Sequence, residues 1–242
     1  MPRLVSLCLI TGAATLAVTA CTPFDREAVR GSGEVITRDY DVSDFDRIRV
    51  GRALDIEIVP GDTHSVELTA DDNIMRYITV DQRGDTLVLD VDDDVSLRRV
   101  THRFEIAVPE LERVELHGAA SAVLDGFTLG DGIELDLSGA SELEGTGIKV
   151  TSLHLDLSGA SEVRLDGTGD TADVRASGTS FVELRDLTVA EADVELHGAG
   201  KANVTATRQL DADLSGFSKL RYGGDPSLGR IETSGGSNVA PA

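Results

Sequence analysis

The sequence predicts an all-β fold in which short parallel strands stack as the coils of a solenoid. Three observations predict it. From Gly118 to Gly235 a glycine returns every 18–21 residues, and apolar and polar residues alternate on both sides of each one. Alternation with period two indicates half-buried strands. A repeat near 20 residues is too short for a helix with its return strand, but it fits one coil of two or three strands.

A β-sandwich built from regular hairpins is the alternative fold. Hairpins are expected to carry Asn-Gly or Asp-Gly turns and to vary in length. Here the interval between successive glycines stays within 18–21 residues over the whole repeat region. The sequence therefore favours the solenoid.

The first 20 residues have the pattern of a secretory signal peptide. A positive charge at Arg3 precedes an apolar run over 4–18, which is shorter than the about 20 residues that span a bilayer. The run ends in the sequence VTAC over 18–21, which resembles the lipobox of bacterial lipoproteins. That resemblance implies cleavage before Cys21 and acylation of its thiol. An ordinary cleavage site with a chance cysteine is the alternative.

Cysteine usage and the residue after Cys21 extend this prediction. Cys8 leaves with the signal peptide, so Cys21 is the only thiol of the mature chain and cannot form an internal disulfide. The enterobacterial sorting rule retains lipoproteins at the inner membrane when Asp follows the cysteine, whereas Thr22 stands here. We therefore expect a lipid-anchored protein of the bacterial cell envelope, with the outer membrane favoured in a Gram-negative host.

The composition narrows the classes of ligand. Asp and Glu number 43 against 22 Lys and Arg, which gives a net charge of −21. Nucleic-acid binding needs clustered basic residues, so we expect no nucleic-acid partner. The chain has no Trp and only 4% aromatic residues, which argues against surfaces on which sugars or bases stack.

Residues 31–110 keep the alternation without the glycine interval. We read them as wider opening turns of the same solenoid, with room for one short helix at 73–78. A solenoid of about ten coils results if every turn takes about 20 residues. The predicted organisation is a signal peptide, a lipidated tether and one β-helix domain, at 1–20, 21–30 and 31–242.

The repeat also predicts columns of equivalent residues, because coils of a solenoid stack about 4.8 Å apart. At each corner a glycine is expected where the chain needs a positive φ or brings backbone against backbone. A column of small hydroxyl residues follows, which should hydrogen-bond the local backbone at the bend. Its members are Ser141, Ser161, Ser180, Ser218 and Ser237.

The chain from about Gly31 onward resembles a family of bacterial envelope proteins known as putative auto-transporter adhesin, head GIN domain. The resemblance implies a single-stranded right-handed parallel β-helix, and the family has no established catalytic site. Its motifs in this sequence are GSG at 31–33, FDRIRVG at 45–51, VPGD at 59–62, GDTLVL at 84–89, IAVPEL at 106–111 and the Ser-Gly-Ala-Ser repeats.

Outward-facing positions before the corner glycines form an acidic stripe. Asp193 and Glu195 are expected to lie directly beside Asp211 and Asp213 on the next coil, which gathers four carboxylates. Such oxygens are the ligands that Ca²⁺ prefers, and like charges on neighbouring strands are unfavourable without some compensation. Two interpretations stay open: a low-affinity calcium site, or an exposed face screened by salt. No other cofactor is expected.

The outward positions after the corner glycines change from acidic to basic along the solenoid. Lys201 and Lys219 fall in one column, read from the sequence as two coils apart, and Arg221 follows on the same face. This basic C-terminal patch is a candidate partner surface, and a chance pattern is the alternative.

The function favoured by these features is a non-catalytic, lipid-anchored envelope protein that presents a rigid β-helix surface for binding or adhesion. A polysaccharide-acting enzyme is one alternative, although coils this regular leave little room for the long loops of such sites. A purely structural envelope component is another. The last coil has no capping helix in the sequence, so we expect self-association through the C-terminal edge.

Overall fold

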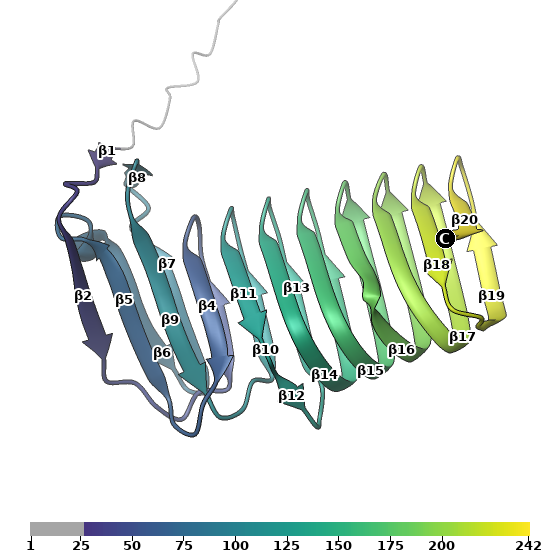
Figure 1. The fold of residues 1–242 in the computed structure, drawn as a ribbon. Coiled ribbons are helices and arrows are strands. Elements are labelled where there is room, and N and C mark those ends of the chain that lie inside the picture. The colour runs from purple at the N-terminus through teal and green to yellow at the C-terminus, as the bar shows by residue number, and fades with distance from the viewer. Residues whose placement is uncertain (1–26) are drawn as a thin grey trace, which may run out of the picture.

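The computed structural model describes residues 27–242, of which 69% lie in strands, and most of these strands stack along one axis (Figure 1). The chain is a parallel β-solenoid of about 6 turns, which confirms the predicted fold class. The predicted signal peptide and Cys21 lie outside the described residues.

The solenoid has a first wall formed by the strands that precede each corner glycine. Consecutive members pair in parallel, and their register is continuous except in the last pairing, where it shifts once between Leu210 and Ala212. The wall consists of β3 (Arg47–Val50), β10 (Arg113–Leu116), β13 (Ile133–Leu137), the C-terminal parts of β14 (Glu142–Leu157), β15 (Glu162–Gly178), β16 (Phe181–Gly198) and β17 (Lys201–Gly216), and β19 (Ser227–Thr233).

A second wall follows the corner, and a short third segment completes each coil. The second wall consists of β4 (Asp55–Pro60), β11 (Ser121–Asp125), the N-terminal parts of β14 to β17, β18 (Lys219–Gly223) and β20 (Asn238–Pro241). The third segment begins at β12 (Thr128–Leu129) and pairs with 149–150 of β14, and it continues through the middle of β15 and β16.

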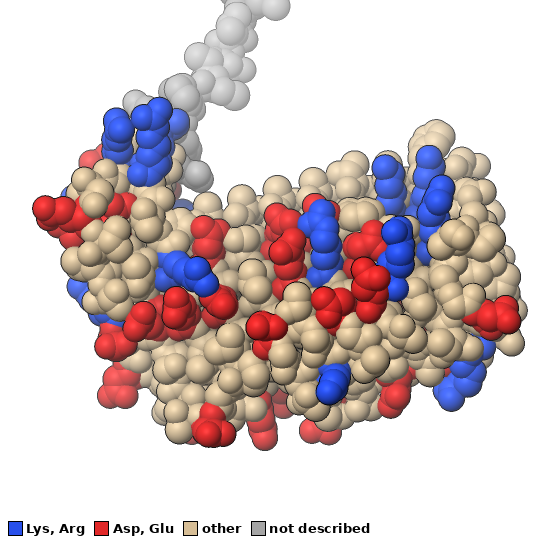
Figure 2. All heavy atoms as spheres, in the orientation of Figure 1, with Lys and Arg blue, Asp and Glu red and all other residues tan. Residues whose placement is uncertain are grey.

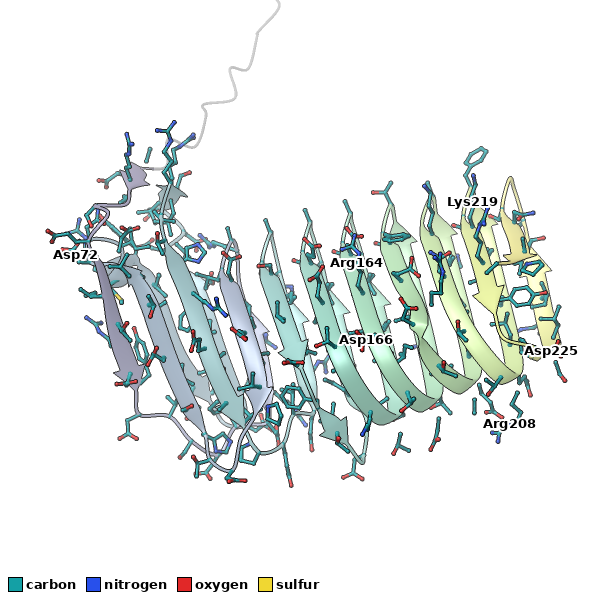
Figure 3. The ribbon with its side chains drawn as sticks, viewed as in Figure 1. Asp72, Arg164, Asp166, Arg208, Lys219 and Asp225 are labelled. Carbon is teal, nitrogen blue, oxygen red and sulfur yellow. The ribbon has the colours of Figure 1, made fainter. Side chains whose placement is uncertain are left out.

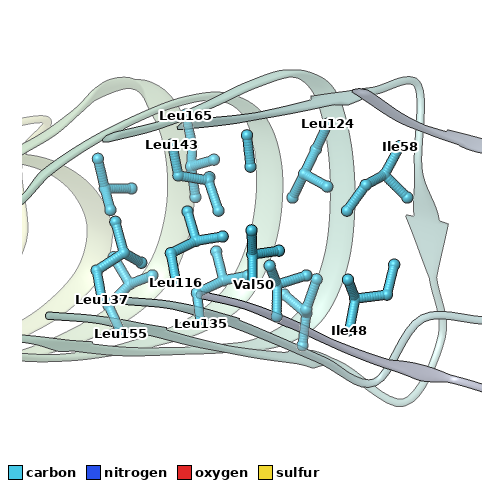
Figure 4. Packing of buried hydrophobic residues seen from close by; sticks show 14 of the residues in the cluster. Ile48, Val50, Ile58, Leu116, Leu124, Leu135, Leu137, Leu143, Leu155 and Leu165 are labelled. Carbon is cyan, nitrogen blue, oxygen red and sulfur yellow. The ribbon is translucent and has the colours of Figure 1, made fainter. Parts of the chain in front are cut away.

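The interior is a continuous stack of aliphatic side chains (Figure 4). Val50, Leu116 and Leu137 follow one another in register on three successive coils, and each is at most 2% exposed. The predicted alternation therefore places its apolar members in one core. This burial is the main source of favourable folding free energy in such an architecture.

The corner glycines meet both expected conditions at once. Gly159 has φ +82, and a Cβ on it would lie 2.5 Å from the carbonyl oxygen of Gly139 on the preceding coil. That carbonyl accepts a hydrogen bond from the backbone N–H of Ala160 at 2.8 Å. The tight corner thus keeps the ladder of backbone bonds unbroken between coils.

The predicted serine column is confirmed at four positions, each at most 1% exposed. In each case the hydroxyl donates to the carbonyl of the residue three positions earlier, at 2.9–3.0 Å. The four are Ser141, Ser161, Ser180 and Ser218. Ser237 differs, because its hydroxyl accepts from the backbone N–H of Ser218 at 3.3 Å.

The N-terminal end is not a further set of coils, which corrects the prediction of about ten coils. β7 (Thr86–Val91) and β9 (His102–Val108) extend the two walls in parallel. Antiparallel strands then close both: β6 (Ile78–Arg83) lies on β7, and β5 (Ser65–Asp71) joins β9 to β2 (Val35–Tyr40). Alternation in sequence is the same for parallel and antiparallel strands, so it does not distinguish the two.

Two smaller features complete this end. A 3-10 turn, η1 (Met75–Tyr77), lies where the sequence predicts a short helix. Residues 27–30, expected in the tether, form β1 (Glu27–Arg30), which pairs in parallel with β8 (Val95–Arg98). Among the described residues, no helix has the length and apolar character needed to cross a membrane.

Candidate ligand-binding surfaces

The acidic stripe exists as predicted on the first wall. Asp193 of β16 lies opposite Asp211 of β17, and Glu195 lies opposite Asp213. Asp173 of β15 precedes Asp193 in the same column. The parallel register therefore brings together carboxylates from three successive coils. A shallow hollow over them is lined by Asp173, Glu191, Asp193, Gln209 and Asp211, among others.

The carboxylates of the stripe differ in their electrostatic surroundings. The pKa of Asp193 is raised, chiefly by partial burial and then by the charges of Asp173 and Asp211. The pKa of Asp211 is lowered because the backbone N–H of Arg230 donates to Oδ1 at 2.6 Å and Gln209 donates to Oδ2 at 2.5 Å. Both oxygens of Asp211 thus already accept hydrogen bonds from the protein.

These contacts bear on the calcium hypothesis. Within residues 27–242, no group of three or more His, Cys, Asp or Glu side chains is arranged so that it could hold a metal ion. Each oxygen of Asp211 already accepts one hydrogen bond, so only its remaining lone pairs are open to a cation. The two interpretations of the stripe, calcium binding and screening by salt, remain predictions that a stability measurement separates.

The stripe is neutralised at its N-terminal end by two arginines, Arg113, which the repeat places five positions before Gly118, and Arg49, which lies outside the repeat. β3 adds Arg49 to the column, and its Nε lies 2.6 Å from Oε2 of Glu115. Arg113 Nη2 lies 2.6 Å from Oδ2 of Asp136. The hydrogen bond from Arg49 is the main reason that the pKa of Glu115 is lowered. The motif at 45–51 contains Arg49, but only the pairing of β3 with β10 shows its partner.

The basic patch lies on the second wall near the C-terminal end (Figures 2 and 3). Lys201 lies opposite Lys219, and Asn203 lies opposite Arg221. The two lysines are therefore on neighbouring coils, which corrects the interval of two coils read from the sequence. All three basic side chains are exposed, and none has a carboxylate within 4 Å among the described residues.

An exposed aromatic ring adjoins these three cations. Phe217 follows the corner glycine Gly216 and is 74% exposed. Its ring lies over Gly236 of the last coil, where a Cβ would be 2.6 Å from ring atom Cδ1. The other coils carry Ala, Thr or Gly at this corner position, and that exception in the repeat could have identified the ring. We call Lys201, Phe217, Lys219 and Arg221 the C-terminal patch.

Comparison with known proteins identifies a family and a shared fold. The family model described as putative auto-transporter adhesin, head GIN domain matches residues 44–226. Curated proteins give no match. A crystal structure described as a putative adhesin from Bacteroides fragilis superimposes with a TM-score of 0.83 at 22% identity, covering 88% of this chain and 100% of that chain.

Two structures from Parabacteroides distasonis also share the fold. One is described as a putative lipid binding protein, with a TM-score of 0.70 at 20% identity, and the other as a putative adhesin, with 0.69 at 18%. Each comparison covers 89% of this chain and 100% of the other. The chain therefore belongs to the family described as putative auto-transporter adhesin, head GIN domain.

Proposed function

We propose that this protein is a non-catalytic, lipid-anchored protein of the bacterial cell envelope that binds an anionic partner through the C-terminal patch. One observation carries the proposal. In a chain with a net charge of −21, three exposed cations without a described carboxylate partner flank an exposed phenylalanine. Like charges in direct register are unfavourable unless a ligand compensates them.

The anchor is supported by the sequence VTAC at 18–21, in which Cys21 would be acylated. An envelope location is supported by the family description and by the fold relatives described as adhesins. The relative from P. distasonis described as a lipid binding protein is compatible with attachment to a membrane. We extend this to the outer membrane when the host is Gram-negative.

A binding role is favoured over a catalytic one by the shape of the coils. The corners from β13 to β18 are tight turns around a glycine, so the first two walls present nearly flat ladders of side chains. Catalysis usually requires convergent acids and bases in a concave site. The C-terminal patch is exposed on one of these ladders, which suits contact with another extended surface.

The test uses soluble residues 22–242 and two anionic polymers, polygalacturonate and polyglutamate. We expect wild-type protein to co-sediment with at least one polymer at low salt and to release when the salt is raised, because screening weakens such contacts. The variant Lys201→Gln/Lys219→Gln/Arg221→Gln should lose this binding. Arg30→Gln/Arg98→Gln/Arg99→Gln, which carries the same change in charge at the other end, should keep it.

Two results would contradict the proposal. Equal binding by both variants would show that the C-terminal patch does not bind the polymer. New reducing ends in the polygalacturonate would show that the protein cleaves it and is an enzyme. The anchor is tested separately by mass spectrometry of the protein extracted from cells. Acyl chains on the N-terminal Cys21, and their loss together with membrane association in Cys21→Ser, are the expected results.

A further inference from the structure

A second group of cations lies at the opposite end of the solenoid, on the small sheet of β1 and β8 (Figure 2). The register places Arg30 directly opposite Arg98, and Arg99 follows with a φ of +49. All three side chains are exposed. A hollow in the surface is lined by these three arginines and Ala28.

These arginines differ from most others in the chain. Ten arginines have a carboxylate within 4 Å: Arg47, Arg49, Arg52, Arg83, Arg103, Arg113, Arg164, Arg175, Arg185 and Arg208. Within residues 27–242, none of the three at this end has such a partner. An acidic chain that leaves three guanidinium groups together and unneutralised presents a surface suited to an external anion.

The position in the chain indicates which anion. Only residues 22–26 separate the predicted acylation site, Cys21, from the first residue of β1. Five extended residues span at most about 18 Å. An acyl chain on Cys21 would therefore hold Arg30, Arg98 and Arg99 close to the lipid headgroups. A guanidinium group can donate two parallel hydrogen bonds to the oxygens of one phosphate.

We propose that Arg30, Arg98 and Arg99 form a docking surface for the phosphate groups of anionic phospholipids beside the lipid anchor. This inference rests on the proposed lipid anchoring of Cys21 and adds an orientation to it. Basic residues beside a lipid anchor add an electrostatic attraction to an anionic membrane surface, and here they would determine which end of the protein faces the bilayer. With β1 and β8 at the bilayer, the C-terminal patch lies at the far end of the solenoid (Figure 1).

The test attaches the acyl chain chemically. Residues 21–242 contain every described strand and the whole buried core, so this fragment keeps the fold. Its only thiol is Cys21, which reacts with a maleimide that carries one 14-carbon chain. Partitioning is measured by sedimentation with vesicles of phosphatidylcholine, or of phosphatidylcholine and phosphatidylglycerol at 7:3. The readout is the partition coefficient for vesicles with phosphatidylglycerol divided by that for vesicles of phosphatidylcholine alone.

The wild-type ratio should exceed that of Arg30→Gln/Arg98→Gln/Arg99→Gln by roughly tenfold or more, because each basic residue near an anionic surface contributes about fivefold. Lys201→Gln/Lys219→Gln/Arg221→Gln has the same change in net charge at the far end and should keep the wild-type ratio. Substituting the three N-terminal arginines by lysine should preserve most of the effect. The wild-type ratio should also fall when NaCl is raised, because salt screens the attraction between the arginines and the anionic surface.

The proposal is overturned if the two glutamine variants have equal ratios, or if the wild-type ratio does not respond to salt. Equal thermal midpoints show that the variants are folded. The acyl chain is attached in vitro, so a negative vesicle result would overturn the docking surface without testing whether Cys21 is acylated in cells. Conversely, finding no acyl chains on Cys21 in cells would overturn the lipid anchor without changing the vesicle result.

Discussion

At the scale of single residues, the corner glycines determine how closely the coils stack. Gly159 combines a left-handed φ with direct contact against the carbonyl of Gly139, which also accepts the hydrogen bond that links the two coils. A side chain there would meet two separate penalties, one for the conformation and one for the contact. Gly126 has a φ of +72, and no atom lies within 4 Å of the position that a Cβ would take, so it isolates the first penalty.

We expect Gly126→Ala to lower the free energy of unfolding by about 1 kcal/mol, the cost of a left-handed conformation for alanine. Gly159→Ala should cost roughly 2 kcal/mol more, because the carbonyl of Gly139 cannot move without breaking its bond to Ala160. Urea unfolding of both variants measures the difference. Equal losses of unfolding free energy in the two variants would mean that close contact between the Gly159 and Gly139 corners adds no cost to a side chain at Gly159.

Asp193 shows the electrostatic cost of the stripe at a single residue. Its folded-state pKa lies above the ordinary value, so its ionised form is less favourable in the fold than in the unfolded chain. We expect Asp193→Asn to stabilise the protein at neutral pH by about 0.5 kcal/mol. Wild type gains stability as the pH falls through this raised pKa, so the difference should shrink on acidification. Paired urea titrations across that range measure it; a difference that does not change with pH would contradict the assignment.

At the scale of elements, the two ends of the solenoid are built differently. The N-terminal end finishes with the antiparallel strands β2 and β6, whereas the C-terminal end finishes with the parallel strands β19 and β20. Each of these four strands pairs on one side only. β19 carries an irregularity at 229–230, where Asp211 accepts a hydrogen bond from the backbone of Arg230. Bulges of this kind, and a proline such as Pro241, hinder pairing with another strand. The side chains of the last coil, such as Val239, nevertheless remain only partly covered.

If the protein self-associates through the C-terminal edge, we therefore expect the contact to be made by side chains that cover the end of the core, and not by pairing of strands. We expect residues 22–242 to show a dimeric or larger mass in light scattering. Val239→Lys should shift this mass to that of a monomer by placing a charge in the contact. Val123→Lys, at a valine that is 40% exposed on β11, is the matched control and should not. A monomeric wild type would exclude the interface.

At the scale of the whole molecule, charge is distributed unevenly along the axis. Carboxylates occupy the walls, and two groups of cations without described carboxylate partners lie at the ends, one at β1 and β8 and one on β17 and β18 (Figure 2). Four other described cations also have no such partner and lie on other elements: Arg38, Arg76, Lys149 and Arg230. The middle of the molecule is occupied by ion-paired arginines, such as Arg164 between Glu142 and Glu144 (Figure 3). The two basic ends are thus available for different surfaces, the bilayer at one end and a partner at the other.

The acidic stripe gives a prediction for overall stability. Because the described carboxylates form no group arranged to hold a metal ion, we expect CaCl₂ to raise the thermal midpoint of residues 22–242 no more than NaCl at the same ionic strength. A ligand that binds only the folded state would raise it further as its concentration passes Kd. A rise specific to calcium would instead establish a site at Asp193, Glu195, Asp211 and Asp213.

Much of the fold could be predicted because its constraints are local and repeated. The glycine interval sets the coil length, the alternation sets the core, and together they place Asp193 opposite Asp211 without any structure. The N-terminal end could not be predicted in the same way. The sequence of β5 alternates as the coils do, yet the strand runs antiparallel to both of its neighbours.

The sequence by itself therefore determined the coil, its columns and the acidic stripe, since each follows from a short interval that recurs along the chain. Only the tertiary structure decided which distant segments meet. It paired Arg49 with Glu115 and set Arg30 against Arg98. The physical reason is that strand pairing between distant segments depends on the burial and backbone bonding of the whole domain, which no single segment encodes.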